Sequence, residues 1–313
     1  MLPVSRPSRR FPRLLAPIVL FGLLSQTPSA WAQGAESPTL RKLRDTGVLA
    51  LGFRVASPPF SYLDAKRTPV GYSIDLCRHI VEAVKKRLAM PELEVKLVPV
   101  TSATRMPMVA NGTVDLECGI TTNTVERQRT QAFSLTTFVA ESRLLSKRAA
   151  GIQGVDDLRG LPVSSTIATT SIQFLHQLNQ TRHLDMKILA GLDDRDAFRM
   201  LQTDRAVAYA MDDVLLRVAL AGIANAGEYV ISDTAYSVEP YAIGLPRDDP
   251  QFKQLADGVL TELYRSGEIL AIYRRWFLAA IPPKGVNLQL PLSEAFKRVI
   301  QQPTDSPDPQ HYR

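Results

Sequence analysis

Two series of alternating apolar strands and amphipathic helices follow one another along the chain, and this alternation constrains the fold more than any other feature. In each series the strands are short, and the helical segments carry their apolar residues on one face. Such alternation is typical of a mostly parallel sheet covered by helices, so the sequence predicts an α/β protein with two lobes. The expected strands are 48–53, 95–100, 114–118, 162–165, 186–190 and 206–211, and the expected helices are 72–88, 103–111, 171–178, 194–202 and 214–221.

Two extended stretches join the series. Residues 138–146 leave the first series, and residues 241–245 follow the second and lead into further helices, expected near 251–264 and 268–276. If those helices pack on the first lobe, the chain crosses between the lobes twice, near 138–142 and 237–241, and forms a hinge. The predicted organisation is lobe 1 at 40–138 plus 242–281, lobe 2 at 143–237, and a C-terminal tail at 282–313 with one helix near 293–300 and disorder from residue 303.

The N-terminal residues 1–32 are typical of a secretory signal peptide. A basic stretch precedes the apolar run 14–24, which is too short to span a bilayer, and Ala30-Trp31-Ala32 fits a cleavage site. We therefore expect cleavage after Ala32 and a periplasmic mature chain; an uncleaved anchor is the alternative, and the general secretory and twin-arginine routes both stay open. Four of the 37 basic residues and none of the 31 acidic residues lie in this segment, so the remainder is nearly neutral and no nucleic-acid partner is expected.

The chain has two cysteines, Cys77 on an expected helix and Cys118 at an expected strand end. An oxidising compartment permits a disulfide, but spacing alone does not establish one. Because both have apolar neighbours, we expect two buried free thiols. Two cysteines and four scattered histidines give no zinc-like spacing, so we expect no metal and no cofactor.

Arginines and hydroxyl residues follow several of the expected strands. Arg54 comes directly after the first strand, Ser102 and Arg105 follow the second, and Thr122 and Arg127 follow the third. In open α/β sheets the carboxyl ends of the strands face the ligand crevice. A guanidinium fork beside hydroxyl and backbone N–H donors suits a carboxylate, although each residue taken alone is more often a helix cap or a solvated surface residue.

Several motifs together resemble the polar amino-acid branch of extracellular solute-binding proteins, family 3, which serve ABC importers. The match covers roughly residues 40–303, and as a combination the motifs are specific. Three of them, 111–119, 205–213 and 281–284, are most similar to glutamate/aspartate-binding proteins. The motifs are PPFSY at 58–62, GYSID at 71–75, NGTVDLECG at 111–119, TNTVER at 122–127, AFS at 132–134, RAVAYAMDD at 205–213 and IPPK at 281–284.

The resemblance implies a two-lobed periplasmic-binding-protein fold (type II), with the ligand cleft between lobes joined by two hinge crossings. It further implies a role for each matching residue. Arg127 and Thr122 would hold the α-carboxylate of an amino acid, with donors added by Thr166 and Thr169. Asp212 would accept from the α-ammonium. A carboxylate on the ligand side chain would be received by Arg54, Ser102 and Arg105.

Two positions depart from the pattern of this branch. Ile120 stands where a ligand-binding serine is usual, and Asp194 stands where a histidine is usual. A carboxylate at Asp194 would repel an acidic ligand unless Arg54 or Arg105 neutralises it. Asp194 could equally accept from the amide of glutamine or asparagine, or serve only the start of a helix.

The function expected from these residues is amino-acid binding by hinge closure, most strongly for glutamate or aspartate, with delivery by a monomer to the membrane permease. An enzyme on the same fold, such as a dehydratase of a small carboxylic acid, would need a general acid or base, for which Asp194 and Glu117 are the only candidates. Neither has a partner at an evident spacing, so we expect no enzyme. A ligand-sensing domain would use the same pocket with a different partner.

Overall fold

The computed structural model describes residues 2–4 and 36–313, so the predicted signal peptide and its cleavage site lie outside the described residues apart from 2–4. Residues Glu36–Arg313 form one compact unit, and the fold below is that of this unit. Within the described part of the chain, no helix is long and apolar enough to cross a membrane.

The unit is built on a ten-stranded sheet that runs through both predicted lobes in the order β10-β9-β11-β8-β13-β6-β1-β5, with β7 Ala132–Phe133 and β12 Tyr229–Ile231 at its sides. On one side of the central pair, β1 pairs in parallel with β5 and β6; on the other, β9 pairs in parallel with β10 and β11. This is the parallel pairing that the alternating sequence pattern predicts. The strands are β1 Val48–Phe53, β5 Glu94–Pro99, β6 Leu116–Thr122, β9 Pro162–Thr166, β10 Lys187–Gly191 and β11 Ala208–Asp212.

The central pair consists of β8 Phe138–Lys147 and β13 Ser237–Leu245, which are antiparallel with Phe138 opposite Tyr241 and Ser142 opposite Ser237. They coincide with the stretches at which the sequence predicts the two crossings. We keep the names lobe 1 for 40–138 with 242–281 and lobe 2 for 143–237. A small sheet of β2 Ala56–Ser57, β3 Ser61–Leu63 and β4 Pro69–Val70 lies in lobe 1.

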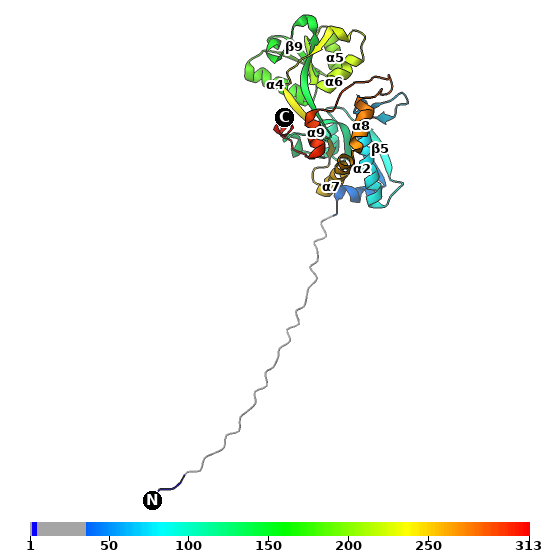
Figure 1. Ribbon diagram of the computed structural model, residues 1–313, viewed down its shortest axis with the longest axis vertical. Coiled ribbons are helices and arrows are strands. Elements are labelled where there is room, and N and C mark those ends of the chain that lie inside the picture. The colour runs from blue at the N-terminus through cyan, green and yellow to red at the C-terminus, as the bar shows by residue number, and fades with distance from the viewer. Residues whose placement is uncertain (1, 5–35) are drawn as a thin grey trace. The chain divides into compact units, whose positions relative to one another are not determined.

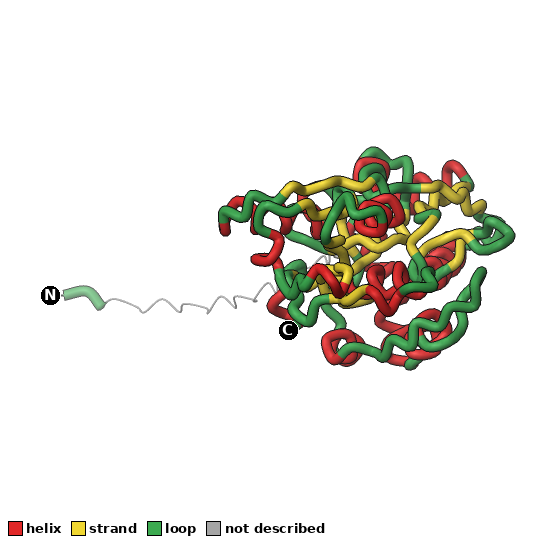
Figure 2. Tube along the Cα trace, turned by 90° about the horizontal axis from the view of Figure 1, so that it is seen from above, coloured by secondary structure: helices red, strands yellow, loops and turns green. Residues whose placement is uncertain are grey.

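Helices cover both parts of the sheet (Figure 1), and a second view shows the strands running between them (Figure 2). In Figure 1 the label of β9 stands among those of α4, α5 and α6, whereas the label of β5 stands among those of α2, α7 and α8. The helices of lobe 1 and its entry are α1 Pro38–Thr46, α2 Tyr72–Leu88, α3 Arg105–Ala110, α7 Pro250–Ser266 and α8 Glu268–Phe277, and those of lobe 2 are α4 Thr170–Arg182, α5 Asp194–Gln202 and α6 Asp213–Ala221.

Local chemistry fixes where these helices begin. Asp249 caps α7 by accepting from the N–H of Phe252 at 2.9 Å, and its other oxygen accepts from the hydroxyl of Ser37 at 2.6 Å, which ties α1 to α7. The start of α2 requires Gly71, because φ is 135° there and a Cβ would lie 2.1 Å from the carbonyl oxygen of Phe60.

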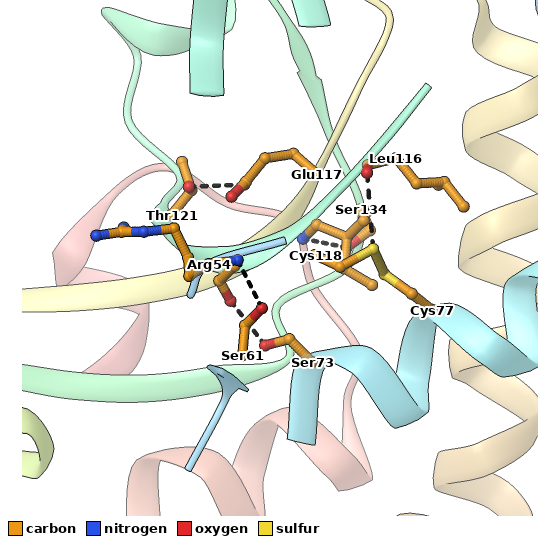
Figure 3. Close-up of a disulfide and its surroundings, with 11 residues drawn as sticks. Arg54, Ser61, Ser73, Cys77, Leu116, Glu117, Cys118, Thr121 and Ser134 are labelled. Carbon is orange, nitrogen blue, oxygen red and sulfur yellow. Dashed lines mark hydrogen bonds between the residues drawn. A yellow bond between two sulfur atoms is a disulfide. The ribbon is translucent and has the colours of Figure 1, made fainter. Parts of the chain in front are cut away.

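The expectation of two free thiols is wrong: Cys77 and Cys118 form a disulfide, with 6.2 Å between their Cα atoms (Figure 3). Helix α2 packs on β6, and both cysteines are fully buried in that contact. The rotation of α2 about its axis turns Cys77 toward the strand, and such a rotation is not visible in the spacing of two residues.

The expectation of disorder from residue 303 is also wrong. The tail helix is α9 Glu294–Gln301, close to the predicted stretch, and the residues after it lie along lobe 1. The N–H of Thr136 donates to the carbonyl oxygen of Thr304 at 2.8 Å, and the amide of Asn123 donates to that of Asp305 at 2.8 Å. Tyr312 is buried and contacts the hydroxyl of Thr136 at 2.7 Å. Backbone hydrogen bonds and one aromatic anchor order this polar segment.

Candidate ligand-binding site

A small cavity lies between the two lobes, and nine of the ten predicted site residues line it. The exception, Thr166, donates a hydrogen bond of 2.7 Å to Asp194, which does line the cavity. Three lining residues were not predicted, namely Thr170, Met211 and Leu215, although the first two adjoin predicted residues in the chain. The lining residues are Arg54, Ser102, Arg105, Ile120, Thr122 and Arg127 from lobe 1 and Thr169, Thr170, Asp194, Met211, Asp212 and Leu215 from lobe 2.

Three arginines of lobe 1 are held at this cavity by the elements that carry them. Arg54 follows β1, and its N–H donates to Ser61 Oγ at 2.9 Å; its side chain extends away from the disulfide (Figure 3). Arg105 is the first residue of α3. Arg127 lies on a 3₁₀ turn, where Nη1 donates to the carbonyl oxygen of Thr122 at 2.9 Å and Nη2 to that of Ala168, in lobe 2, at 3.4 Å.

The arginines bring three buried positive charges to the cavity. Arg54, Arg105 and Arg127 are 5%, 2% and 6% exposed. Burial, reinforced by the charges of Arg127 and Arg54, lowers the pKa of Arg105 to about 9, and burial also lowers the pKa of Arg127. Among the described residues, Arg54 Nη1 and Arg105 Nε are buried without a hydrogen-bond partner. Donors of this kind favour an anion.

Glu117 lies near these arginines but does not line the cavity. It is fully buried on β6, and its Oε2 accepts from the hydroxyl of Thr121 at 2.7 Å. The carboxylate passes so close to the backbone that a Cβ on Gly119 would lie 2.2 Å from Oε1. Its negative charge partly offsets those of Arg105 and Arg127. Glu117 therefore has the position of a counter-charge and not that of an acid facing the cleft.

Asp212, at the end of β11, adds a carboxylate from lobe 2 to the lining of the cavity. Although Asp212 precedes α6, its side chain makes no capping hydrogen bond. It accepts from Ser142 Oγ at 2.5 Å and from the phenol of Tyr241 instead, so both crossing strands hold it. Burial, with the charge of Glu239 second, raises the pKa of Asp212 to about 7. A positively charged partner beside a carboxyl group whose pKa is raised in this way would stabilise its ionised form.

The hydroxyl hydrogens of the predicted threonines are directed into the protein. Thr169 donates to the carbonyl oxygen of Thr166 at 2.6 Å and accepts from the N–H of Ile172, as a helix cap does. Thr122 donates to Glu239 at 2.8 Å. Glu239 is not among the predicted site residues, because nothing in the sequence of β13 marks it as functional. The predicted role of these threonines as donors to a ligand stays a prediction.

Asp194 faces the cleft and does not cap its helix. The cap of α5 is Asp193, which accepts from the N–H of Asp196 at 2.8 Å. Asp194 also borders a second, mostly apolar cavity of about 410 Å³, whose walls include Phe198, Tyr209 and Leu215. Ile120 is 8% exposed and adds an apolar patch to the first cavity.

Around this cavity of about 10 Å³, the arginines offer donors to anionic groups, and the carboxylate of Asp212 offers an acceptor to a cationic group. Within the described residues, no group of three or more histidine, cysteine or acidic side chains is placed to hold a metal ion. The charged and polar groups around the cavity are suited to recognition by charge and hydrogen bonding.

Residues 49–279 match the model of the bacterial extracellular solute-binding proteins, family 3. A protein of Pseudomonas aeruginosa named L-glutamate/L-aspartate-binding protein is 44% identical over 94% of this chain and 97% of its own length. The glutamate/aspartate import solute-binding protein of Escherichia coli strain K12 is 42% identical over 93% of this chain and 96% of its own length. A glutamine-binding protein of Geobacillus stearothermophilus is 29% identical over 70% of this chain and 80% of its own length.

Solved structures of amino-acid-binding proteins have the same fold. A crystal structure of the P235GK mutant of ArgBP from T. maritima superposes with a TM-score of 0.67 at 26% identity, covering 76% of this chain and 98% of that chain. The cysteine-binding protein from Campylobacter jejuni gives a TM-score of 0.67 at 22% identity, covering 80% of this chain and 96% of that chain. This likeness concerns the fold alone.

Proposed function

Because the chain belongs to the bacterial extracellular solute-binding proteins of family 3, we propose that it binds glutamate or aspartate and delivers it to the membrane permease of an ABC importer. The observation that carries the choice of ligand is the placement of three buried arginines around one cavity that the carboxylate of Asp212 also lines. The relatives at 42–44% identity are named as binding proteins for these two amino acids.

An acidic amino acid has two negative groups and one positive group, and the cavity offers a partner for each. Arg127 is placed for the α-carboxylate, Arg54 and Arg105 for the side-chain carboxylate, and Asp212 for the α-ammonium. Removing either member of a buried ion pair leaves the other charge unpaired, which costs about 3–5 kcal/mol. A ligand that matches all of the charges is therefore favoured over one that matches only some.

The proposed cycle is export to the periplasm, cleavage after Ala32, capture of the ligand by a monomer, and closure of the two lobes before docking to the permease. Closure by rotation at β8 and β13 would shield the ion pairs from water. Glutamine or asparagine is the second candidate ligand, because Asp194 lines the cavity with an oxygen that can accept from an amide.

A screen of the mature chain, residues 33–313, against the twenty amino acids tests the proposal. A ligand at about 100 times its Kd should stabilise the protein by about 2.7 kcal/mol and raise the melting temperature. Glutamate and aspartate should give the largest shifts, and calorimetry should confirm one site. If no amino acid binds, the proposed function is wrong; if the amides bind most tightly, only the ligand assignment is wrong.

A further inference from the structure

Glu239 lies on β13, and its carboxylate receives hydrogen bonds from two residues that line the cavity, one in each lobe. The side chain is 1% exposed. Its Oε2 accepts from Thr122 Oγ1 at 2.8 Å and from Thr170 Oγ1 at 2.6 Å, whereas Oε1 accepts from Ser237 Oγ and lies 3.4 Å from Ser142 Oγ. Thr122 ends β6 in lobe 1, and Thr170 begins α4 in lobe 2. One carboxylate oxygen therefore joins the two lobes.

The two threonine hydroxyls can offer only lone pairs to the cavity while they are bound to Glu239. A hydroxyl has one hydrogen and two lone pairs, and a carboxylate only accepts. Because the hydrogens of Thr122 and Thr170 are both directed to Glu239, the oxygens remain as acceptors in the wall that both residues line. Together with the carboxylate of Asp212, they form an acceptor set suited to a group with three hydrogens and a positive charge.

We propose that Glu239 is a positioning residue of the site, which holds the hydroxyls of Thr122 and Thr170 as acceptors for the α-ammonium group of the ligand. This inference rests on the proposed function, since it requires an amino-acid ligand. It changes the role of Thr122 from a donor toward the α-carboxylate to an acceptor from the ammonium. The α-carboxylate is then left to Arg127 and to backbone N–H groups.

The arrangement also links recognition to closure. The acceptor pair needs Thr122 from lobe 1 and Thr170 from lobe 2, and their oxygens are 3.5 Å apart when the lobes meet. An ammonium group that donates to both threonine hydroxyls would have all of its hydrogen-bond acceptors in place only in the closed state. A ligand without the ammonium would lack this reason to favour closure.

The test compares two substitutions of Glu239 with matched controls. Glu239→Met removes both acceptor oxygens at similar volume, so the threonine hydroxyls lose their partner; affinity for glutamate should fall about tenfold or more, as expected for one lost charged hydrogen bond. Glu239→Gln keeps one oxygen that can face both threonines and should lose clearly less. Glu141→Gln removes a part-exposed carboxylate on the neighbouring strand and should bind as the wild type does.

A second readout separates positioning from a structural role. Glutamate labelled with ¹⁵N and ¹³C is bound at saturation to each variant, and its resonances are compared. In Glu239→Met the ammonium ¹⁵N shift should change while the side-chain carboxyl ¹³C shift stays at its wild-type value. If Glu239→Met does not fold, Thr170→Val serves with the same readouts, against Thr181→Val, whose hydroxyl on the same helix binds only backbone.

Each other outcome overturns the inference. Unchanged affinity in Glu239→Met or, where that variant does not fold, in Thr170→Val shows that the hydroxyls are not held for the ligand. Equal losses in Glu239→Met and Glu239→Gln assign the effect to charge alone. Lost affinity with an unchanged ¹⁵N shift, or with both shifts moved together, assigns it to the fold. If the wild-type protein binds no amino acid, the proposed function and this inference fail together; if it does bind, the inference can fail alone.

Discussion

Ser142 Oγ donates a 2.5 Å hydrogen bond to Oδ1 of Asp212, which ties the first crossing strand to a carboxylate that lines the cavity. Tyr241, on the second crossing strand, donates to the other oxygen of the same carboxylate. Both strands of the central pair thus hold the group that we assign to the ligand's ammonium. A rotation at these strands would move that group, so binding and hinge geometry are mechanically connected.

Asp212→Asn should lose most of the affinity for amino acids and yet stabilise the ligand-free protein at pH 8. The pKa of Asp212 is raised to about 7 in the folded state, chiefly by burial, so the stability that its protonated form contributes is present below the unfolded pKa and is lost as the pH rises through about 7. Asparagine is neutral throughout. Relative to the wild type, the melting temperature of Asp212→Asn should therefore rise at pH 8, by an amount equivalent to about 2–4 kcal/mol. Near pH 4 it should change little.

Asp213→Asn is the matched control for binding. Asp213 accepts from the N–H of Glu141 at 3.2 Å and does not line the cavity. It should bind nearly as the wild type does. Abolished binding in Asp213→Asn with retained binding in Asp212→Asn would mean that the assignment within the pair is reversed.

Arg127→Ala should cost about 3 kcal/mol of binding free energy, or on the order of 100-fold in Kd, because a desolvated carboxylate loses its bidentate partner. Arg129→Ala, on the same 3₁₀ turn but exposed, should leave Kd unchanged. Isothermal calorimetry on folded variants measures both. Equal affinities for the wild type and Arg127→Ala would contradict the role given to this arginine.

Replacing both cysteines, Cys77→Ala with Cys118→Ala, should lower the free energy of unfolding without changing the cleft. The disulfide closes a loop of 41 residues, for which loop entropy gives about 4 kcal/mol as an upper figure. Denaturant unfolding should show the loss, and reductant should destabilise the wild type but not the variant. A variant as stable as the wild type would show that packing of α2 on β6 suffices.

The cavity wall could be predicted because a parallel sheet brings successive strand ends to one edge. Arg54, Arg105 and Arg127 each follow a different strand of lobe 1, so the alternating pattern alone places them together. The role of Asp212 came from the resemblance, since a local reading favours a helix cap. The structure excludes that interpretation, because the side chain of Asp212 makes no capping hydrogen bond.

Other features depend on tertiary contacts that no local pattern carries. The Cys77–Cys118 bond needs the rotation of a helix over a strand. Glu239 sits in an apolar-rich strand where a buried acid has no sequence signal, and its function becomes visible only when hydroxyls from two lobes meet on it. The tail around Tyr312 is polar in composition, and long-range backbone bonds give it order.

The protein should close on its ligand by rotation at the paired strands β8 and β13. Small-angle scattering of the mature chain should show a smaller radius of gyration with saturating ligand than without it. Asp212→Asn, which is expected to lose affinity, should keep the ligand-free radius under the same conditions. An identical radius in both states of the wild type, with binding confirmed by calorimetry, would contradict hinge closure at these crossings.

The ligand should be an acidic amino acid, with Asp194 reducing the positive charge of the pocket without reversing its preference. Arg54 and Arg105 bring two positive charges to the side-chain end, and Glu117 and Asp194 both act against the charge of Arg105. A ligand carboxylate offers two oxygens to the unpartnered donors Arg54 Nη1 and Arg105 Nε, whereas the amide of glutamine offers one. In competition binding, glutamate and aspartate should displace a bound probe at well below the concentrations that glutamine and asparagine require; displacement in the opposite order would make Asp194 an acceptor for the ligand amide.

Asp194→His then tests how Asp194 acts. The hydroxyl of Thr166 donates to Asp194 at 2.7 Å and the side chain lines the cavity, so the carboxylate is in place to oppose an acidic ligand. Replacing it with histidine removes that repulsion, and affinity for glutamate should rise, more at pH 6 than at pH 8 because imidazole gains charge as the pH falls. Asp193→Asn changes the neighbouring cap of α5 and should leave selectivity as it is. Unchanged glutamate affinity in Asp194→His would confine Asp194 to the first turn of its helix.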